Sequence, residues 1–596
     1  MTSTRNNEIT ELQFDQFGII PDTGQDAVPA MRQALEAAAA ASGPVKLVVR
    51  PGRYDFYPEQ ATRALYYITN TASESENPDV TKTIAVHMKG LTDFTLDGSG
   101  ALFVFHGKMT MFALDGCERV VIQRLHTDFA RPTVTEMTVD EQGEGYADFR
   151  VHSDSHYEIS GGRLFWTGDG WRFDDGPVQL CDPARNTTWR VDNFVKEADR
   201  AEELEPGRIR LYGERLPRLA EGWVVQSRDG IRDQVGMFIN RSRDIRLEEV
   251  GVHFMHGLGI VGQFSENLTF RRIDLSPRAE TGRTAAAFAD FVHLSGCKGT
   301  VEVDGSRFAG AHDDAINVHG TYLRIIDFPA SNQALVRFMH PQTYGFVAFE
   351  AGDEIEWVKA HSLVCAGRDR VERAEMIGLR DMLLTFSGNK PDRIKEGDVI
   401  ENVTWTPEVV VTDNHFARIP TRGVLVTSGR KAVVERNTFE RMRMSGVLVA
   451  GDAADWFESG PVRDLTVRYN RFIGCGTEEL AVISLLSENE EVDERNPVHT
   501  GIRILDNRFE MEEATLVLDA KSVKGLTFEG NTVVWGEDRP EREQASKSPD
   551  TGTISIATTA DAASAKATEA ADHSGILSAI RLTACSDVTV ADNKVE

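Results

Sequence analysis

The feature that most constrains the fold of this chain is a short β motif that recurs along it. SRDIRLEEVGVHF and SENLTFRRIDL begin two successive units, with Asp244 and Asn267 at equivalent positions 23 residues apart. Later units share one design: a short alternating strand, an asparagine, a phenylalanine or valine, a corner and a second strand. Their asparagines are Asn414, Asn437, Asn470, Asn507, Asn531 and Asn593. A period of roughly 20 to 30 residues made of strands predicts a solenoid, because each unit buries its apolar face against its neighbours.

The strand pattern favours one class of solenoid. Leucine-rich repeats need a fixed LxxLxL frame, which these units lack. We therefore predict an all-β chain folded as a right-handed parallel β-helix. An asparagine at each corner is expected to adopt the left-handed conformation and to hydrogen-bond along a ladder of its neighbours.

The N-terminal part, residues 1–131, is predicted to cap the solenoid and to form its first rungs. LTDFTLDGSGALFVF and CERVVIQRLHTDF repeat the motif. Before them, residues 23–42 have helical spacing of Val28, Met31, Leu35 and Ala38, and the proline at position 29 falls where a first helical turn tolerates it. A helix here would cover the open end of the solenoid, whose unpaired strand edge would otherwise promote aggregation.

Two long interruptions break the period. They are predicted at 132–235 and 320–408, and both contain short alternating runs broken by Gly, Pro and Asp. We interpret each as a small inserted β-barrel or sandwich. Rungs are expected at 236–319 and 409–596, with a mobile loop near 536–575, which is rich in Ala, Ser, Thr, Asp and Glu.

Composition limits the partners of this 596-residue chain. Its formal net charge of −28 argues against nucleic acid and anionic membrane surfaces, because steering would be repulsive. The first residues show no basic segment followed by an apolar run, so we expect a cytoplasmic protein, or a secreted one if a signal has been removed. The six cysteines are widely dispersed and are expected to be reduced core residues rather than disulfide partners or zinc ligands.

Three aspartates are predicted to meet on neighbouring rungs. Aligning 289-ADFVHLSG-296 with 313-DDAINVHG-320 places Asp290 on Asp314, one rung of 24 residues away. Adjacent parallel strands lie about 4.8 Å apart, so the two carboxylates should stack, with Asp313 beside them. The later segment IPTRGVLV aligns Arg422 with the next rung.

Such a cluster suggests acid–base chemistry. An adjacent Asp pair alone is more often a solvated turn or part of a Ca²⁺ site. Three close carboxylates cannot all ionise cheaply, so at least one pKa should be raised. A protonated acid beside ionised carboxylates is what glycosidic bond cleavage requires. His312, His319 and Arg422 are predicted to tune these charges or to bind sugar hydroxyls. His256 is predicted to contact substrate and His253 to be structural, and Trp166, Trp171 and Trp357 are candidate sugar platforms.

The segments FADFVHLSGCKG and GAHDDAINVHG, on a β-helix with two β insertions, resemble the α-1,3-galactosidases of glycoside hydrolase family 110. The resemblance implies an inverting exo-hydrolase that removes terminal α-1,3-linked galactose with Asp290, Asp313 and Asp314. By similarity to the related β-helical polygalacturonases, Asp313 is the general acid, while Asp290 and Asp314 position and deprotonate water. It also implies a glycan partner ending in α-galactose and no cofactor or metal, and it leaves a homodimer open.

Three alternatives remain at this point. A polygalacturonase would show a GHG element and an RxK clamp, for which the rungs after the motif offer no clear counterpart. A pectate lyase would need a Ca²⁺ carboxylate cluster with a catalytic Arg or Lys, a role that Arg422 keeps open. A non-catalytic, glycan-binding or structural β-helix is the third alternative, although it would not need three stacked acids.

Overall fold

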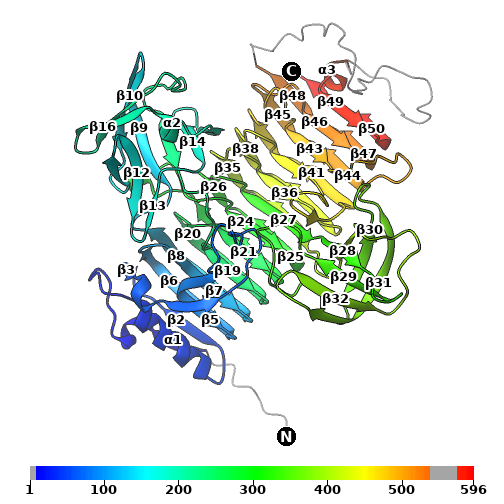
Figure 1. The fold of residues 1–596 in the computed structure, drawn as a ribbon, viewed down its shortest axis with the longest axis horizontal. Coiled ribbons are helices and arrows are strands. Elements are labelled where there is room, and N and C mark those ends of the chain that lie inside the picture. Colours follow the sequence, from blue (N-terminus) through cyan, green and yellow to red (C-terminus); the bar gives the residue numbers. More distant parts are fainter. Residues whose placement is uncertain (1–8, 537–573) are drawn as a thin grey trace. The chain divides into compact units, whose positions relative to one another are not determined.

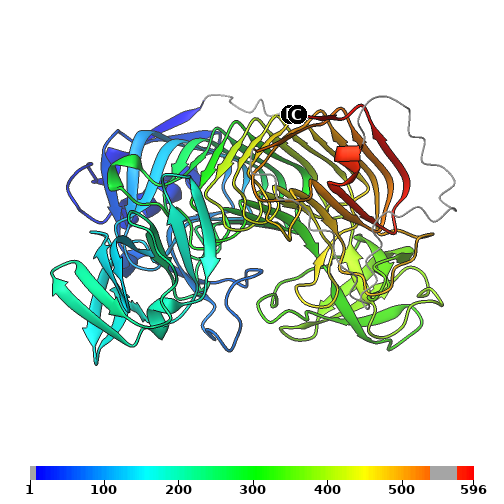
Figure 2. The same cartoon turned by 90° about the horizontal axis from the view of Figure 1, so that it is seen from above.

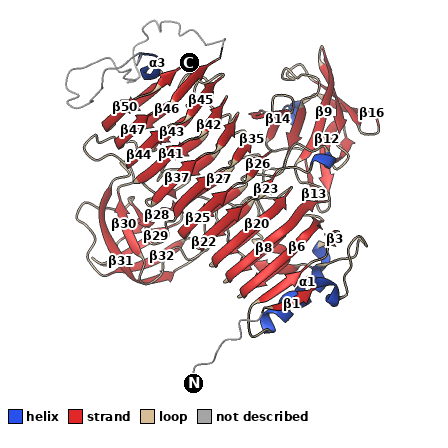
Figure 3. Cartoon of the chain, turned by 180° about the vertical axis from the view of Figure 1, so that it is seen from behind, coloured by secondary structure: helices blue, strands red, loops and turns tan. Residues whose placement is uncertain are grey.

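The computed structural model describes residues 9–536 and 574–596, so the loop predicted near 536–575 lies almost wholly outside the described residues. The regular secondary structure of the described chain is almost entirely β-strand (Figure 1, Figure 3). It divides into two compact units, one of residues 1–315 with 417–420 and one of residues 316–416 with 421–596. Each unit contains parallel β-helix rungs and one inserted β-domain, and in each the successive coils lie side by side (Figure 2).

The rungs of the first unit are stacked parallel strands. Ile245 pairs with Val120 on one side and Leu268 on the other, and Leu268 pairs with Val301. All four side chains are buried, so aliphatic groups stack rung upon rung in the interior. One sheet contains β1 (Thr10–Gln13), β2 (Val45–Val48), β3 (Arg53–Phe56), β6 (Thr92–Phe105), β8 (Glu118–Phe129), β20 (Arg243–Val252), β22 (Glu266–Arg271), β23 (Asp274–Leu275), β25 (Lys298–Asp304) and β26 (Arg307–Ala309).

A second sheet of the first unit faces the first one across the coil. It contains β4 (Thr62–Leu65), β5 (Thr81–Lys89), β7 (Thr110–Asp115), β19 (Met237–Asn240), β21 (Ile260–Gln263) and β24 (Val292–Ser295). From β5 onward these strands pair in parallel, one rung at a time. The alternation of two sheets along the chain is the parallel β-helix that the repeat predicted.

The predicted N-terminal helix is present as α1 (Val28–Ala40). Val28, Met31, Leu35 and Ala38 are all buried, and the helix packs on β2 and β5. Pro29 lies in the first turn, where its missing N–H has no helical acceptor. None of the helices in the described residues is long and apolar enough to span a bilayer.

The first insertion consists of two antiparallel sheets around one core. The core contains Phe149, Leu164, Trp166, Leu180 and Ile209. A seven-stranded sheet has the order β15-β14-β18-β9-β10-β17-β16, and a three-stranded sheet has the order β11-β12-β13. Their bounds are β9 (Thr135–Gly143), β10 (Tyr146–Val151), β11 (His156–Ser160), β12 (Arg163–Gly168), β13 (Trp171–Phe173), β14 (Val178–Asp182), β15 (Thr187–Val191), β16 (Arg200–Glu205), β17 (Arg208–Tyr212) and β18 (Val224–Ser227), with the short helix α2 (Phe194–Glu197) after β15.

The second unit repeats the rung design. One series of parallel strands is β34 (Glu408–Thr412), β37 (Lys431–Glu435), β41 (Asp464–Arg468), β44 (His499–Leu505), β47 (Val523–Glu529) and β50 (Ser586–Ala591). A second is β27 (Ile316–Thr321), β36 (Val424–Val426), β39 (Val447–Val449), β43 (Ile483–Leu486), β46 (Leu518–Lys521) and β49 (Ile580–Thr583). A third is β38 (Thr438–Glu440), β42 (Arg471–Ile473), β45 (Arg508–Met511), β48 (Thr532–Trp535) and β51 (Lys594–Val595).

The asparagine ladder is present in these rungs, but its backbone conformation differs from the prediction. Asn437 donates its backbone N–H and its side-chain N–H to Oδ1 of Asn470, at 2.9 and 3.0 Å. The left-handed residue is the one before each asparagine, as at Arg436 (φ 55°) and Tyr469 (φ 55°). The asparagine itself does not adopt the left-handed conformation, because its side-chain amide must contact both the asparagine of the next rung and a strand carbonyl.

The second insertion is a closed barrel in the second unit. Its strand order is β28-β29-β32-β31-β30-β33, and its neighbouring strands pair in antiparallel fashion. The strands are β28 (Leu323–Asp327), β29 (Gln333–Arg337), β30 (Glu354–Val358), β31 (Cys365–Met376), β32 (Asp381–Phe386) and β33 (Val399–Asn402). Closure removes the free strand edges that an open sheet of this size would expose.

The cysteines are structural. All six lie in the described residues as free thiols, and Cys117, Cys181, Cys297 and Cys475 are buried. Burial raises the pKa of Cys181 and Cys297 to about 12, so these thiols stay protonated and unreactive near neutral pH. Cys365 and Cys585 are only partly buried, so four of the six cysteines are the core residues that the sequence predicted.

Candidate active site

The predicted rung register of the aspartates is present in the first unit. The backbone N–H of Phe291 donates to the carbonyl of Asp314, and that of Val292 to the carbonyl of Ala315, both at 3.0 Å. In a parallel ladder these bonds pair residues 24 apart. Asp290 and Asp314 therefore occupy equivalent positions on adjacent rungs, and Asp313 immediately precedes Asp314.

The three carboxyl groups differ in their surroundings. Asp290 and Asp314 are buried, whereas the side chain of Asp313 is 24% exposed. Asp290 Oδ2 lies 2.8 Å from Nδ1 of His293, which is itself buried in β24. This contact fixes the orientation of Asp290, and Asp313 is the most accessible acid of the three.

The first insertion supplies two guanidinium groups near Asp313. Arg190 of β15 places Nη2 3.0 Å from Oδ1 of Asp313, and the same Nη2 donates to the carbonyl of His312 at 3.1 Å. Arg228, which follows β18, is buried over the ring of Phe288 at 4.7 Å. Burial lowers the pKa of Arg228 to about 10, and the negative charge of Asp313 opposes this shift. Both cations favour the ionised form of Asp313.

His312 is an uncharged member of this group. Its ring is buried, and Nε2 has no hydrogen-bond partner among the described residues. Burial and the positive charges of Arg228 and Arg190 hold its pKa well below the usual 6.5. His312 therefore does not supply positive charge to the carboxylates at neutral pH, which was one of its two predicted roles.

His256 and His253 lie one rung before Asp290. His256 is fully buried, with Nε2 2.8 Å from Asp233 and Nδ1 2.6 Å from the hydroxyl of Thr133, so both ring nitrogens are engaged within the protein. His253 stacks on His126 with centroids 5.2 Å apart. The ring of His256 links Asp233 to Thr133. The stacking of His253 on His126 agrees with the prediction that His253 has a structural role.

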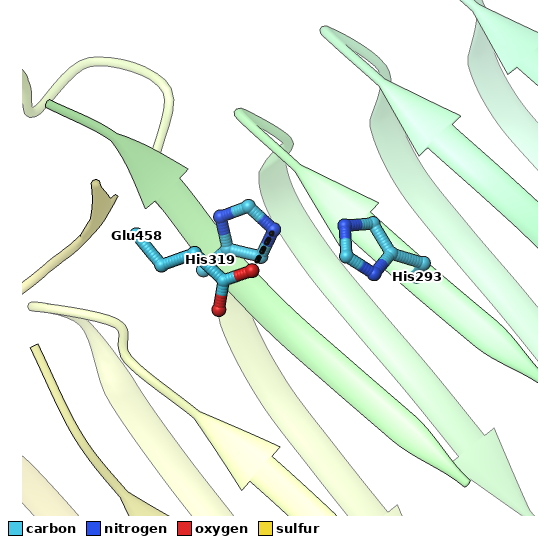
Figure 4. Close-up of side chains that lie close together, drawn as sticks. All are labelled: His293, His319 and Glu458. Atoms are coloured by element: carbon cyan, nitrogen blue, oxygen red, sulfur yellow. Dashed lines mark ion pairs between the residues drawn. The ribbon is translucent and has the colours of Figure 1, made fainter. Parts of the chain in front are cut away.

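In the second unit His319 lies beside a carboxylate. His319 is buried in β27, and its Nε2 lies 3.5 Å from Glu458 of β40 (Glu458–Ser459) (Figure 4). Asn317 donates to the same carboxylate at 3.4 Å.

Arg422 also belongs to the second unit. It lies two residues before Val424, which pairs with Ile316 of β27. Its Nη1 is 3.4 Å from Sδ of Met444, and the side chain is partly buried. The predicted role of Arg422 toward substrate stays a prediction.

Two of the three candidate sugar platforms are buried in the inserted domains. Trp166 is 2% exposed in the core of the first insertion, and Trp357 is fully buried in the barrel of the second. Each points inward from its strand, so neither ring face is open to a sugar. Trp171 is partly buried and packs against Phe173, with centroids 5.7 Å apart.

Sequence reasoning missed Arg190, Arg228, His293 and Glu458. His293 stands inside the quoted motif ADFVHLSG, so its proximity to Asp290 was a signal that could have been used. Arg190 and Arg228 carry no such signal, because only the folding of a domain of about 100 residues brings them to Asp313.

Two stretches of the chain match known domain families. Residues 135–225 match the GLAA-B beta-barrel domain I, and residues 333–400 match the GLAA-B beta-barrel domain II. A protein of Bacteroides thetaiotaomicron named alpha-1,3-galactosidase A is 42% identical over 86% of this chain and 90% of its own length. Proteins with the same name from Streptomyces avermitilis and Akkermansia muciniphila are 35% and 34% identical, over 89% and 82% of this chain and 88% and 81% of their own lengths.

Proposed function

Since this chain belongs to the α-1,3-galactosidase family, glycoside hydrolase family 110, we propose that it hydrolyses terminal α-1,3-linked galactose from glycans. The relatives bear that activity in their names and match most of this chain and most of themselves. The observation that carries the proposal to particular residues is the rung register that puts Asp290 level with Asp314, directly beside Asp313. A glycan is therefore the proposed substrate.

The proposed roles follow from accessibility and contacts. Asp313, the most exposed of the three, is the general acid that protonates the leaving oxygen. Arg190 favours its ionised form in the substrate-free protein, so proton donation requires this ion pair to be exchanged for contacts with the glycan. Asp290, oriented by His293, and Asp314 position and deprotonate the attacking water.

Two bases around one water support inversion at the anomeric carbon. An inverting enzyme attacks from the face opposite the leaving group, and its acid and base stand roughly 6.5–9.5 Å apart to leave room for that water. Hydrolysis of an α-galactoside by this route releases β-galactose first.

The test is galactose release from an α-1,3-galactosyl oligosaccharide, followed by proton NMR from the first seconds. The unmodified protein should release β-galactose, and Asp314→Asn should lower kcat on the order of a hundredfold or more because the base is lost. Asp244→Asn, an exposed aspartate at a rung corner, is the matched control and should keep full activity. Equal rates for Asp314→Asn and the unmodified protein would remove Asp314 from the site, and initial α-galactose would exclude inversion.

A further inference from the structure

The first insertion carries a groove that begins at Arg190. A cavity of about 690 Å³ is lined by residues of β15, α2 and the loop 213–217, among them Arg190, Asp192, Glu197 and Arg215. A second cavity of about 460 Å³ shares Phe194, Glu197 and Arg215 with the first but does not include Arg190. We call these two adjoining cavities, between residues 190–199 and 213–217, the insertion groove.

One end of the insertion groove is fixed to the candidate general acid. Arg190 lines the first cavity and at the same time pairs with Asp313 at 3.0 Å. The second cavity adjoins the first through their shared residues, and Arg190 lines only the first. The insertion groove is thus joined through Arg190 to the carboxyl that would protonate the leaving oxygen, although Asp313 itself does not line it.

The charges of the insertion groove suit a neutral, hydroxyl-rich ligand. Asp192, Glu197 and Arg215 are exposed, and among the residues that the structure describes no ion pair joins any of the three to another side chain. Carboxylates accept hydrogen bonds from sugar hydroxyls and a guanidinium donates to them. A chain of uronic acids would instead meet the carboxylates of Asp192 and Glu197 and be repelled.

We propose that the insertion groove binds the neutral sugars on the leaving-group side of the scissile bond. This rests on the proposed function, because an exo-hydrolase leaves every sugar but one on that side. The volume of the first cavity lies within the roughly 300–1,000 Å³ typical of small-ligand sites. Arg190 is the positioning residue that links the insertion groove to the candidate general acid, since contacts with a bound sugar would draw its guanidinium away from Asp313.

The first experiment compares two substrates on Arg215→Ala and Glu197→Gln. One substrate is an α-1,3-galactosyl trisaccharide, and the other is p-nitrophenyl α-galactoside, which has no sugar on the leaving-group side. Each variant should raise KM for the trisaccharide about tenfold, because one hydrogen bond between the sugar and a charged side chain is lost. KM for the aryl galactoside should stay unchanged. Arg218→Ala, an exposed arginine of the same insertion outside the groove, is the control. Equal changes in KM for both substrates, or none for either, would overturn the proposal.

The second experiment measures binding without turnover. The disaccharide left after galactose removal is titrated calorimetrically into the unmodified protein, Arg215→Ala and Arg218→Ala. If only Arg215→Ala binds the disaccharide more weakly, the proposal that the insertion groove binds sugars is supported. Equal affinity of all three proteins would overturn this proposal. If the protein binds this disaccharide through Arg215 but releases no galactose, the proposed function is contradicted, whereas sugar binding in the insertion groove is still supported.

Discussion

Glu401, in β33 of the second unit, is a carboxyl group whose charge is set by burial. It is 1% exposed, its Oε1 accepts a 3.4 Å hydrogen bond from Ser459, and its Oε2 has no partner among the described residues. Burial, together with the negative charge of the neighbouring Glu356, raises its pKa to about 8. Arg463 and Arg368, which pair with Glu356, oppose this shift. Glu401 is therefore protonated at neutral pH and acts as a neutral hydrogen-bonding group.

This state predicts a pH dependence of stability. In the unfolded chain the Glu401 carboxyl has its ordinary pKa of 4.5, so between about pH 4.5 and 8 only the unfolded chain loses the proton. The free energy of unfolding should then fall as pH rises through this window, by on the order of 1 kcal/mol per pH unit. Glu401→Gln, which is neutral at every pH, should flatten the decline.

The measurement is urea unfolding of both proteins at pH 5, 6, 7 and 8. Glu396→Gln, an exposed glutamate of the same barrel, is the control and should follow the unmodified protein. Parallel curves for Glu401→Gln and the unmodified protein would show that Glu401 is ionised in the folded state.

At the scale of the element, the rungs of the second unit are held by two stacks. The asparagine ladder runs from Asn414 through Asn437, Asn470, Asn507 and Asn531 to Asn593, each accepting from the asparagine before it. Phe416, Phe439, Phe472 and Phe509 stack beside it with centroids 4.8–5.0 Å apart. Because each ladder amide satisfies two donors of the adjacent rung, one member cannot be lost without orphaning buried groups.

We expect Asn470→Ala to lower the free energy of unfolding by about 3 kcal/mol. The change removes acceptors for the backbone and side-chain N–H of Asn437 and the donor to Val434, and unsatisfied buried donors cost about 1–3 kcal/mol. Asn593→Ala, at the last rung and more exposed, should cost less. Urea unfolding of both variants, with Asn496→Ala in an exposed turn as control, tests the order. An equal loss for Asn470→Ala and Asn496→Ala would remove the ladder as a source of stability.

At the scale of the whole molecule, the formal net charge of −28 restricts the substrates. Long-range repulsion disfavours the approach of any polyanion, most strongly at low ionic strength. This separates the family activity from the polygalacturonase alternative, whose substrate is a polymer of uronic acids. Neutral galactosides are not affected by this repulsion.

Polygalacturonate should accordingly be neither cleaved nor inhibitory at low salt. The measurement is the rate on p-nitrophenyl α-galactoside with and without polygalacturonate at about 10 and 150 mM NaCl, where the screening length falls from about 30 to 8 Å. Neutral galactan fragments of the same length serve as the control. Inhibition that grows as salt is lowered would indicate a locally basic cleft, and reducing ends released from polygalacturonate would favour the alternative activity.

Local periodicity predicted the fold far better than it predicted the site. Alternating apolar residues, corner residues and the 24-residue offset of two motifs determine which strands pair, so the β-helix, the cap helix α1 and the level positions of Asp290 and Asp314 followed from the sequence. These features depend on contacts between neighbouring rungs, and the length of one rung can be read in the sequence as the spacing between repeated motifs. In the asparagine ladder of the second unit the left-handed position was misplaced by one residue, because side-chain hydrogen bonding across rungs decides which corner residue bends; at Asn267 of the first unit (φ 57°) the prediction was right.

The remaining features needed the tertiary structure. Arg190 reaches Asp313 from 123 positions earlier in the chain, and only the packing of an inserted domain determines that approach. Burial, which is a property of the assembled molecule, made His312 and Glu401 neutral and turned Trp166 and Trp357 into core residues. The sequence by itself thus determined the repeat and the alignment of its acids, while the folded insertions decided which charges and cavities surround them, because contacts between distant segments leave no periodic trace.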